Sequence, residues 1–158
     1  MYNIILNITT FCNFKCSYCD VIKDNKILDL NKRNKIINFI NDNKWSIYKF
    51  KFFWWEPLIS WLDIKYIIDE TNESIWSNYE IVTNTSLLND DIWLYFNKYF
   101  KIIFFSIDSE NFFDYPKVFS FIKKFDLKDK VFFNLIVSPW SESKSLYQFY
   151  KLYNFWYR

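Results

Sequence analysis

Short runs of β-branched and aromatic residues alternate with longer amphipathic runs along the whole chain. The short runs are typical of strands, and the longer runs, with apolar residues at helical spacing, are typical of helices. The pattern predicts strands over residues 2–9, 47–53, 79–83, 101–107 and 131–137. It predicts helices over residues 30–42, 60–72, 87–98, 115–125 and 141–154.

The order of these elements predicts an α/β fold. Five strand–helix units in series favour a parallel sheet with right-handed crossovers. No linker, repeat or low-complexity segment interrupts the 158 residues, a length that suits one domain with a substantial core. We therefore expect residues 1–158 to form a single domain, a partial β/α (TIM-like) barrel of about five parallel units.

Residues whose side chains can bind a ligand or react follow the predicted strands. In parallel β/α folds, ligands bind at this edge of the sheet. A single Asn or Asp in such a place is more typical of a turn or a helix cap than of a ligand site. Their repeated occurrence at one edge of the sheet predicts a site there. The candidate residues, in strand order, are Cys12, Cys16, Cys19, Trp54, Trp55, Glu56, Pro57, Asn84, Ser106, Asp108 and Asn134.

The three cysteines are the strongest of these signals. They are the only cysteines, they lie in one short loop after the first strand, and the chain has no histidine. Three thiolates can each hold one iron of a [4Fe-4S] cluster, which normally takes four cysteines. The fourth iron would then lack a protein ligand and stay open to another molecule.

Other uses of the cysteines fit less well. Tetrahedral zinc needs a fourth ligand, and its sites usually comprise two separated Cys or His pairs, although Asp20 is adjacent in sequence. A redox pair of Cys16 and Cys19 would leave Cys12 unexplained. A structural disulfide is atypical of a chain without a secretion signal. We favour an iron–sulfur site and keep a small zinc-binding interaction module as an alternative.

Charge and apolar content limit the partners and the compartment. The net charge of +2 is too small and too scattered to indicate nucleic-acid or membrane binding. The apolar stretch at the start is too short for a signal peptide or a transmembrane helix. Free cysteines without a targeting segment favour the reducing cytoplasm.

The loop Cys-Asn-Phe-Lys-Cys-Ser-Tyr-Cys and the later Glu-Pro-Leu resemble the motifs of the radical S-adenosylmethionine (radical SAM) enzymes. The resemblance extends over essentially the whole chain and implies a single radical SAM core domain. In that family, three cysteines hold a [4Fe-4S] cluster, and its open iron binds the amino and carboxylate groups of S-adenosylmethionine (SAM). The implied metal ligands are Cys12, Cys16 and Cys19.

The resemblance also implies which residues contact SAM. Tyr18 matches an aromatic position near the adenine, which is the favoured interpretation; a packing aromatic is the alternative. Glu56 and Pro57 match the end of a Gly-Gly-Glu-Pro-Leu motif that receives the methionine amino group. The other implied cofactor contacts, to the ribose, the carboxylate or nearby groups, are Asn84, Ser106, Asp108 and Asn134.

The resemblance implies reductive cleavage of SAM to a 5′-deoxyadenosyl radical, which abstracts hydrogen from a substrate. The substrate could be a peptide, a protein or a small molecule, and the loop looks slightly more like the peptide-modifying branch. A flavodoxin or ferredoxin would supply the electron; no nucleic acid or membrane partner is expected. With all cysteines used, and a start directly at the first strand, we expect neither a second cluster nor a leader-peptide-binding domain.

Trp54 and Trp55 stand where the family has two glycines, so two indoles would fill space that SAM needs. The chain has eight tryptophans and no glycine, and aromatic residues make up 25% of it. Some bacterial lineages read UGA as glycine, and a different translation table would print tryptophan. Glycine would suit turns or helix ends elsewhere too, namely at Trp45, Trp76, Trp140 and Trp156. Alternatively the tryptophans are genuine and the protein is a non-catalytic relative.

The family barrel usually has six strands, and this chain runs out before a sixth. The fifth predicted strand contains the uncharged, apolar sequence Val-Phe-Phe-Asn-Leu-Ile-Val over residues 131–137. An apolar edge strand is a ready site for pairing with another chain. We expect this edge to be covered by a continuation of the chain, a partner or a second copy.

Overall fold

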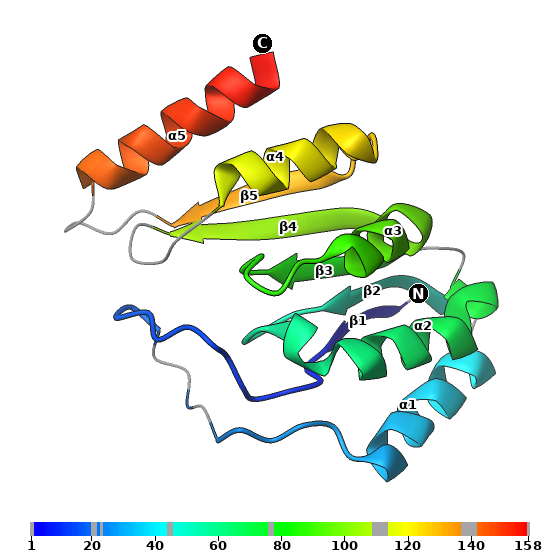
Figure 1. The fold of residues 1–158 in the computed structure, drawn as a ribbon. Coiled ribbons are helices and arrows are strands. Elements are labelled where there is room, and N and C mark those ends of the chain that lie inside the picture. Colours follow the sequence, from blue (N-terminus) through cyan, green and yellow to red (C-terminus); the bar gives the residue numbers. More distant parts are fainter. Residues whose placement is uncertain are drawn as a thin grey trace.

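The computed structural model describes residues 2–19, 22, 24–43, 46–75, 78–108, 114–136 and 142–157. Strands and helices alternate through these ranges (Figure 1). The strands are β1 (Tyr2–Leu6), β2 (Ile47–Phe52), β3 (Tyr79–Thr83), β4 (Phe100–Asp108) and β5 (Val131–Ile136). The helices are α1 (Leu30–Asp42), α2 (Trp61–Ile75), α3 (Asp90–Tyr99), α4 (Tyr115–Lys124) and α5 (Glu142–Tyr157), and a 3₁₀ turn, η2 (Pro57–Ser60), precedes α2.

The strands form one parallel sheet in the order β1-β2-β3-β4-β5. All arrowheads in Figure 1 point to the same edge, where the blue loop that follows β1 also lies. Each helix returns the chain to the opposite edge, as a parallel connection requires. The predicted α/β fold, a partial TIM-like barrel of five parallel units, is therefore confirmed.

Some element boundaries differ from the predictions because of local hydrogen bonds. The predicted first strand reached residue 9, but β1 ends at Leu6 and the chain turns away to pair with residues 26–28. Asn89 caps α3 by accepting a hydrogen bond from the Ile92 backbone N–H at 3.0 Å, so that helix begins at Asp90 and not at residue 87. Val137 and Ser141, at two other predicted boundaries, lie outside the described residues.

The core lies between the helices and one face of the sheet. Alternate strand residues point to this face, and Phe50, Phe52 and Tyr79 are fully buried there. The hydroxyl groups of Tyr79 and Thr71 of α2 lie 2.8 Å apart, which satisfies both groups in an apolar setting. Trp93 of α3 is also fully buried. The high aromatic content therefore fills the layer between sheet and helices.

The opposite face of the sheet carries a charged group. The side chain of Glu80 on β3 is only 4% exposed, and Lys49 of β2 approaches it at 2.8 Å. The Lys51 ammonium lies 4.0 Å from the same carboxylate and 4.4 Å from the centre of the Phe104 ring. These two lysines compensate the buried charge of Glu80.

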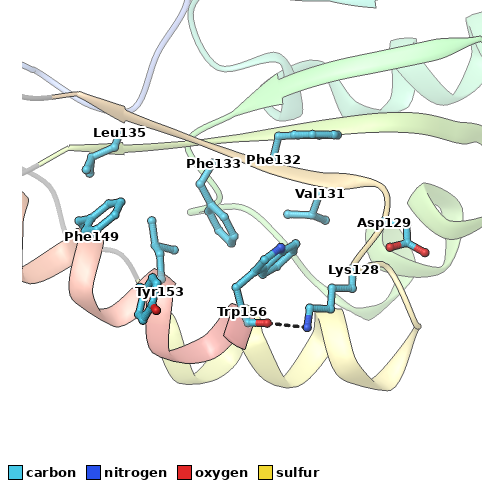
Figure 2. Close-up of a pocket in the computed structure, with 10 residues that line it drawn as sticks. Lys128, Asp129, Val131, Phe132, Phe133, Leu135, Phe149, Tyr153 and Trp156 are labelled. Carbon is cyan, nitrogen blue, oxygen red and sulfur yellow. Dashed lines mark hydrogen bonds between the residues drawn. The ribbon is translucent and has the colours of Figure 1, made fainter. Parts of the chain in front are cut away.

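β5 forms the last position of the sheet and pairs with β4 on one side. In the part of the chain that the structure describes, no strand pairs with its other side. A groove of about 730 Å³ separates β5 from α5, and Figure 2 shows Phe133, Leu135 and Phe149 around it. At one end of the groove, the Lys128 ammonium donates a hydrogen bond to the Trp156 carbonyl oxygen at 2.8 Å. The predicted apolar edge is thus present; what covers it stays a prediction.

None of the helices in the described ranges has both the length and the apolar character that crossing a bilayer requires.

Candidate functional site

Backbone hydrogen bonds close the base of the cysteine loop. The Leu28 N–H donates to the Ile8 carbonyl at 2.9 Å, and the Thr10 N–H donates to the Lys26 carbonyl at 2.8 Å. The Thr9 hydroxyl also donates to that carbonyl, at 3.0 Å. These bonds pair residues 8–10 with residues 26–28, so the two ends of the loop lie together at the sheet edge.

The loop places all three cysteines around one cavity of about 250 Å³. None of them forms a disulfide with another described cysteine, and all three have intermediate exposure. The Cys19 N–H donates to the Cys16 carbonyl at 3.2 Å, which makes a turn between these two residues. Among the described residues, no three Cys, Asp or Glu side chains form a group that could hold a single metal ion. A [4Fe-4S] cluster makes a different demand, because each thiolate binds a separate iron.

Several other predicted residues line the same cavity, at the carboxyl edge of the sheet. These are Tyr18 from the loop, Trp54 and Trp55 after β2, Asn84 after β3 and Ser106 on β4. Segments far apart in sequence therefore converge, because parallel strands bring their carboxyl ends to one edge.

Three predicted residues with described side chains, Glu56, Pro57 and Asn134, do not line the cavity, and a fourth, Asp108, cannot be placed. Glu56 and Pro57 are buried beneath it. Asn134 is exposed on β5, in register with Ser106. Asp108 ends β4 in register with Ile136, and its side chain lies outside what the structure describes.

Glu56 is the most unusual titratable residue of the site. Its side chain is fully buried and its carboxylate accepts hydrogen bonds from the Leu58 N–H at 3.0 Å, the Thr83 hydroxyl at 2.8 Å and the Asn84 N–H at 2.7 Å. Burial raises the pKa of Glu56 to about 7, and the three hydrogen bonds offset only part of this rise. The carboxylate thus ties the end of β2 to the end of β3. Its predicted contact with the methionine amino group stays a prediction.

The backbone at Trp54 and Trp55 is left-handed, with φ angles of 74° and 45°. A bulky residue pays roughly 1–2 kcal/mol for this conformation, whereas glycine adopts it freely. The Trp55 indole N–H donates to the Ile22 carbonyl at 3.3 Å, and the Trp54 ring packs against Phe53 with the ring centres 5.0 Å apart. The structure therefore gives both positions the backbone that the family's glycines would supply.

The two indoles also take up part of the cavity. Its volume of about 250 Å³ lies below the roughly 300–1,000 Å³ of ordinary ligand pockets. The thiolate donors suit an iron–sulfur cluster, but the indoles of Trp54 and Trp55 narrow the space beside the cysteines. Of the other tryptophans, Trp45, Trp76 and Trp140 lie outside the described residues, and Trp156 lies in the last turn of α5.

The structure adds apolar site residues that the sequence analysis did not single out. Phe14, Phe53, Val82 and Ile136 line the cavity, and so does Thr83, which precedes the candidate Asn84 at the end of β3. Each of them lies beside a candidate residue in the cysteine loop or at the carboxyl end of a strand, and that proximity was a usable signal.

Asn13 and Ser86 were also missed. Asn13 donates to the Ser86 hydroxyl at 2.8 Å and accepts from the Asn84 side chain at 3.0 Å. These contacts join the cysteine loop to the segment after β3, more than 70 residues away. No sequence pattern would have paired them.

Known proteins resemble this chain in sequence over part of their length. The radical SAM cyclopropyl synthase TigE of Paramaledivibacter caminithermalis is 30% identical over 131 aligned positions, which cover 68% of this chain and 27% of that protein. An uncharacterized protein of Methanocaldococcus jannaschii is 34% identical over 97 positions, which cover 58% of this chain and 33% of that protein. The chain thus matches only about a quarter to a third of these curated relatives. No family model matches it.

Two solved structures share the fold. The complex of anSMEcpe with AdoMet and the Cp18Cys peptide has a TM-score of 0.72 at 16% identity, over 96% of this chain and 48% of that one. BtrN in complex with AdoMet and 2-DOIA has a TM-score of 0.68 at 17% identity, over 85% of this chain and 57% of that one. At these identities the likeness establishes the fold.

Proposed function

Because this chain belongs to the radical SAM superfamily, we propose that it binds a [4Fe-4S] cluster and SAM and cleaves SAM reductively. One observation carries the proposal. The three cysteines and the left-handed turn at residues 54–55 line the same cavity at the carboxyl edge of the sheet. The three thiolates are available to bind the iron atoms of a cluster, and the backbone of the turn at residues 54–55 lies beside the place where SAM would bind.

Each residue of the cavity has a role under this proposal. Cys12, Cys16 and Cys19 would each hold one iron, and the fourth iron would have no cysteine ligand from this chain. When bound, the cluster and SAM supply the 5′-deoxyadenosyl radical that abstracts hydrogen from the substrate. The polar side chains of Asn84 and Ser106 orient the cofactor. The apolar residues around them exclude water from the reacting groups.

We further propose that the active protein has glycine at positions 54 and 55. The support is conformational, because both residues have the positive φ that glycine adopts without strain. It is also steric, because each indole brings on the order of 200 Å² of surface into the cavity. UGA codons at these positions, read as glycine by the host, would account for both observations.

A non-catalytic function is the second candidate, and tryptophan side chains at positions 54 and 55 favour it. If the codons are UGG, Trp54 and Trp55 fill the space that SAM needs, and the protein would keep the fold and the cysteine loop without cleaving SAM. The coding DNA separates the two candidates directly.

The substrate and the electron donor are proposals from the resemblance. The sequence of the cysteine loop favours a peptide or protein substrate, with a small molecule as the alternative. A flavodoxin or ferredoxin would deliver the low-potential electron.

Anaerobic reconstitution tests the proposal. Two proteins are loaded with iron and sulfide: the chain with both tryptophans, and the variant with Trp54→Gly and Trp55→Gly. Both should hold about four irons and four sulfides. After addition of SAM and dithionite, the double variant should release 5′-deoxyadenosine, whereas the chain with both tryptophans should release little. Tight stoichiometric zinc without iron uptake would refute the cluster. Absence of 5′-deoxyadenosine from both loaded proteins would refute the cleavage of SAM.

A further inference from the structure

A ring of three side chains joins the cysteine loop to the segment after β3. The Asn84 amide donates to the Asn13 side-chain oxygen at 3.0 Å, and the Asn13 amide donates to the Ser86 hydroxyl at 2.8 Å. The Ser86 hydroxyl closes the ring by donating to the Asn84 side-chain oxygen at 2.6 Å. Within the ring each member donates one hydrogen bond and accepts one, which fixes the orientation of both amides. The Asn84 side-chain oxygen also accepts a hydrogen bond from the Ser86 backbone N–H at 3.1 Å.

The buried side of the site holds this ring in place. The Asn84 N–H donates to the Glu56 carboxylate at 2.7 Å, which fixes the backbone that carries the Asn84 side chain. The Glu56 N–H donates to the Phe11 carbonyl at 3.3 Å, one residue before Cys12. Glu56 therefore contacts the loop directly at Phe11 and indirectly through Asn84 and Asn13.

Asn13 lies in the part of the loop that carries the cysteines, so its hydrogen bonds restrain the backbone next to Cys12. It lies between Cys12 and Cys16, whereas the hydrogen bonds that close the base of the loop lie at residues 8–10 and 26–28. Asn13 does not line the cavity, but Asn84 does. Asn84 can thus act on the cavity directly, while Asn13 can act on it only through the loop.

We propose that Asn84 is a positioning residue that holds the cysteine loop in its ligating conformation through Asn13. This inference rests on the proposed function, because it concerns the cluster that the loop would hold. It gives Asn84 a role that needs no contact with SAM. Asn13 has the same role, as the member of the ring that belongs to the loop.

The expected effect is local and measurable. Removing either amide opens the ring, and the loop then gains alternative conformations between Cys12 and Cys16 while its base stays closed. A hydrogen bond of this kind changes an equilibrium constant by roughly five- to tenfold. We expect the cluster of each variant to be lost to an iron chelator faster by about that factor. We also expect its reduced form to give an altered electron paramagnetic resonance (EPR) spectrum.

A double-mutant cycle on the reconstituted chain tests this, with Asn13→Ala, Asn84→Ala and the two combined. Because cluster loading needs no SAM and every protein compared keeps Trp54 and Trp55, the two tryptophans do not bias the comparison. If the residues act through one ring, the double variant should lose its cluster no faster than the single variants. Asn72→Ala is the matched control, because within the described residues the Asn72 side chain makes a local hydrogen bond to the Asp69 carbonyl on α2 and none to the cysteine loop. Thermal denaturation of the cluster-free proteins shows that the variants fold.

Three outcomes overturn the inference. Cluster loss and an EPR spectrum unchanged by Asn13→Ala would show that the ring does not position the loop. Additive effects of the two substitutions would show that Asn84 acts independently of Asn13. No cluster in the unaltered protein would refute the proposed function and this inference with it, and that result is distinct from the other two.

Discussion

The burial of Glu56 predicts that the folded protein loses stability as the pH rises toward neutrality. The side chain is fully buried, and its pKa is raised from 4.5 to about 7 because burial penalises the charged form more than its three hydrogen bonds favour it. The folded state therefore holds the proton more tightly than the unfolded state does. The stabilisation is fully present below about pH 4.5 and is lost as the pH rises through about 7.

The magnitude follows from the two pKa values. One pKa unit corresponds to about 1.4 kcal/mol, so the whole effect is about 3 kcal/mol. Between pH 5 and pH 7, the free energy of unfolding should fall by about 2 kcal/mol. The chain has no histidine, so no side chain with an ordinary pKa titrates in this interval and obscures the effect of Glu56.

Urea denaturation of the cluster-free chain at pH 5, 6 and 7 measures this change. The control is Glu56→Gln, which keeps the shape of the side chain and cannot ionise. Its free energy of unfolding should vary little over the same interval, even though the amide loses one of the acceptor oxygens. If the two proteins show the same pH dependence, Glu56 is not the titrating group and the argument from burial is wrong.

Three further predictions concern the cavity and the sheet edge. Replacing Trp54 and Trp55 by Gly should strengthen SAM binding to the cluster-loaded chain by at least roughly tenfold, because the two indoles no longer occupy space beside the cysteines; equal affinities in equilibrium dialysis would contradict this. Cys16→Ala should abolish the broad visible absorption of the reconstituted cluster, whereas retained absorption and iron content would show that the thiol is not a ligand. Phe132, 48% exposed on β5, should promote self-association. Phe132→Lys should reduce this association in sedimentation experiments; an unaltered chain that stays monomeric at high concentration would contradict the expectation of a covered edge.

The sequence determined the order of elements and the edge at which the site lies. Strand and helix periods differ, so alternating apolar patterns located all five β–α units to within a few residues. Parallel connections then required the strand ends to share one edge, which brought Tyr18, Asn84 and Ser106 to the cysteines without any knowledge of contacts. The cysteine spacing indicated the family, because the three cysteines lie within eight residues of one loop.

Only the tertiary structure decided which groups in the site are buried and which segments hold one another. The burial of Glu56 comes from the packing of η2 against β3, and no local pattern around residue 56 encodes it. The sequence placed two bulky residues at 54 and 55, but the left-handed backbone there is visible only in the folded turn. The link between Asn13 and Asn84 spans 71 positions in the chain. Such contacts depend on how strands and loops meet in space, and periodicity records only which face of its own element a residue occupies.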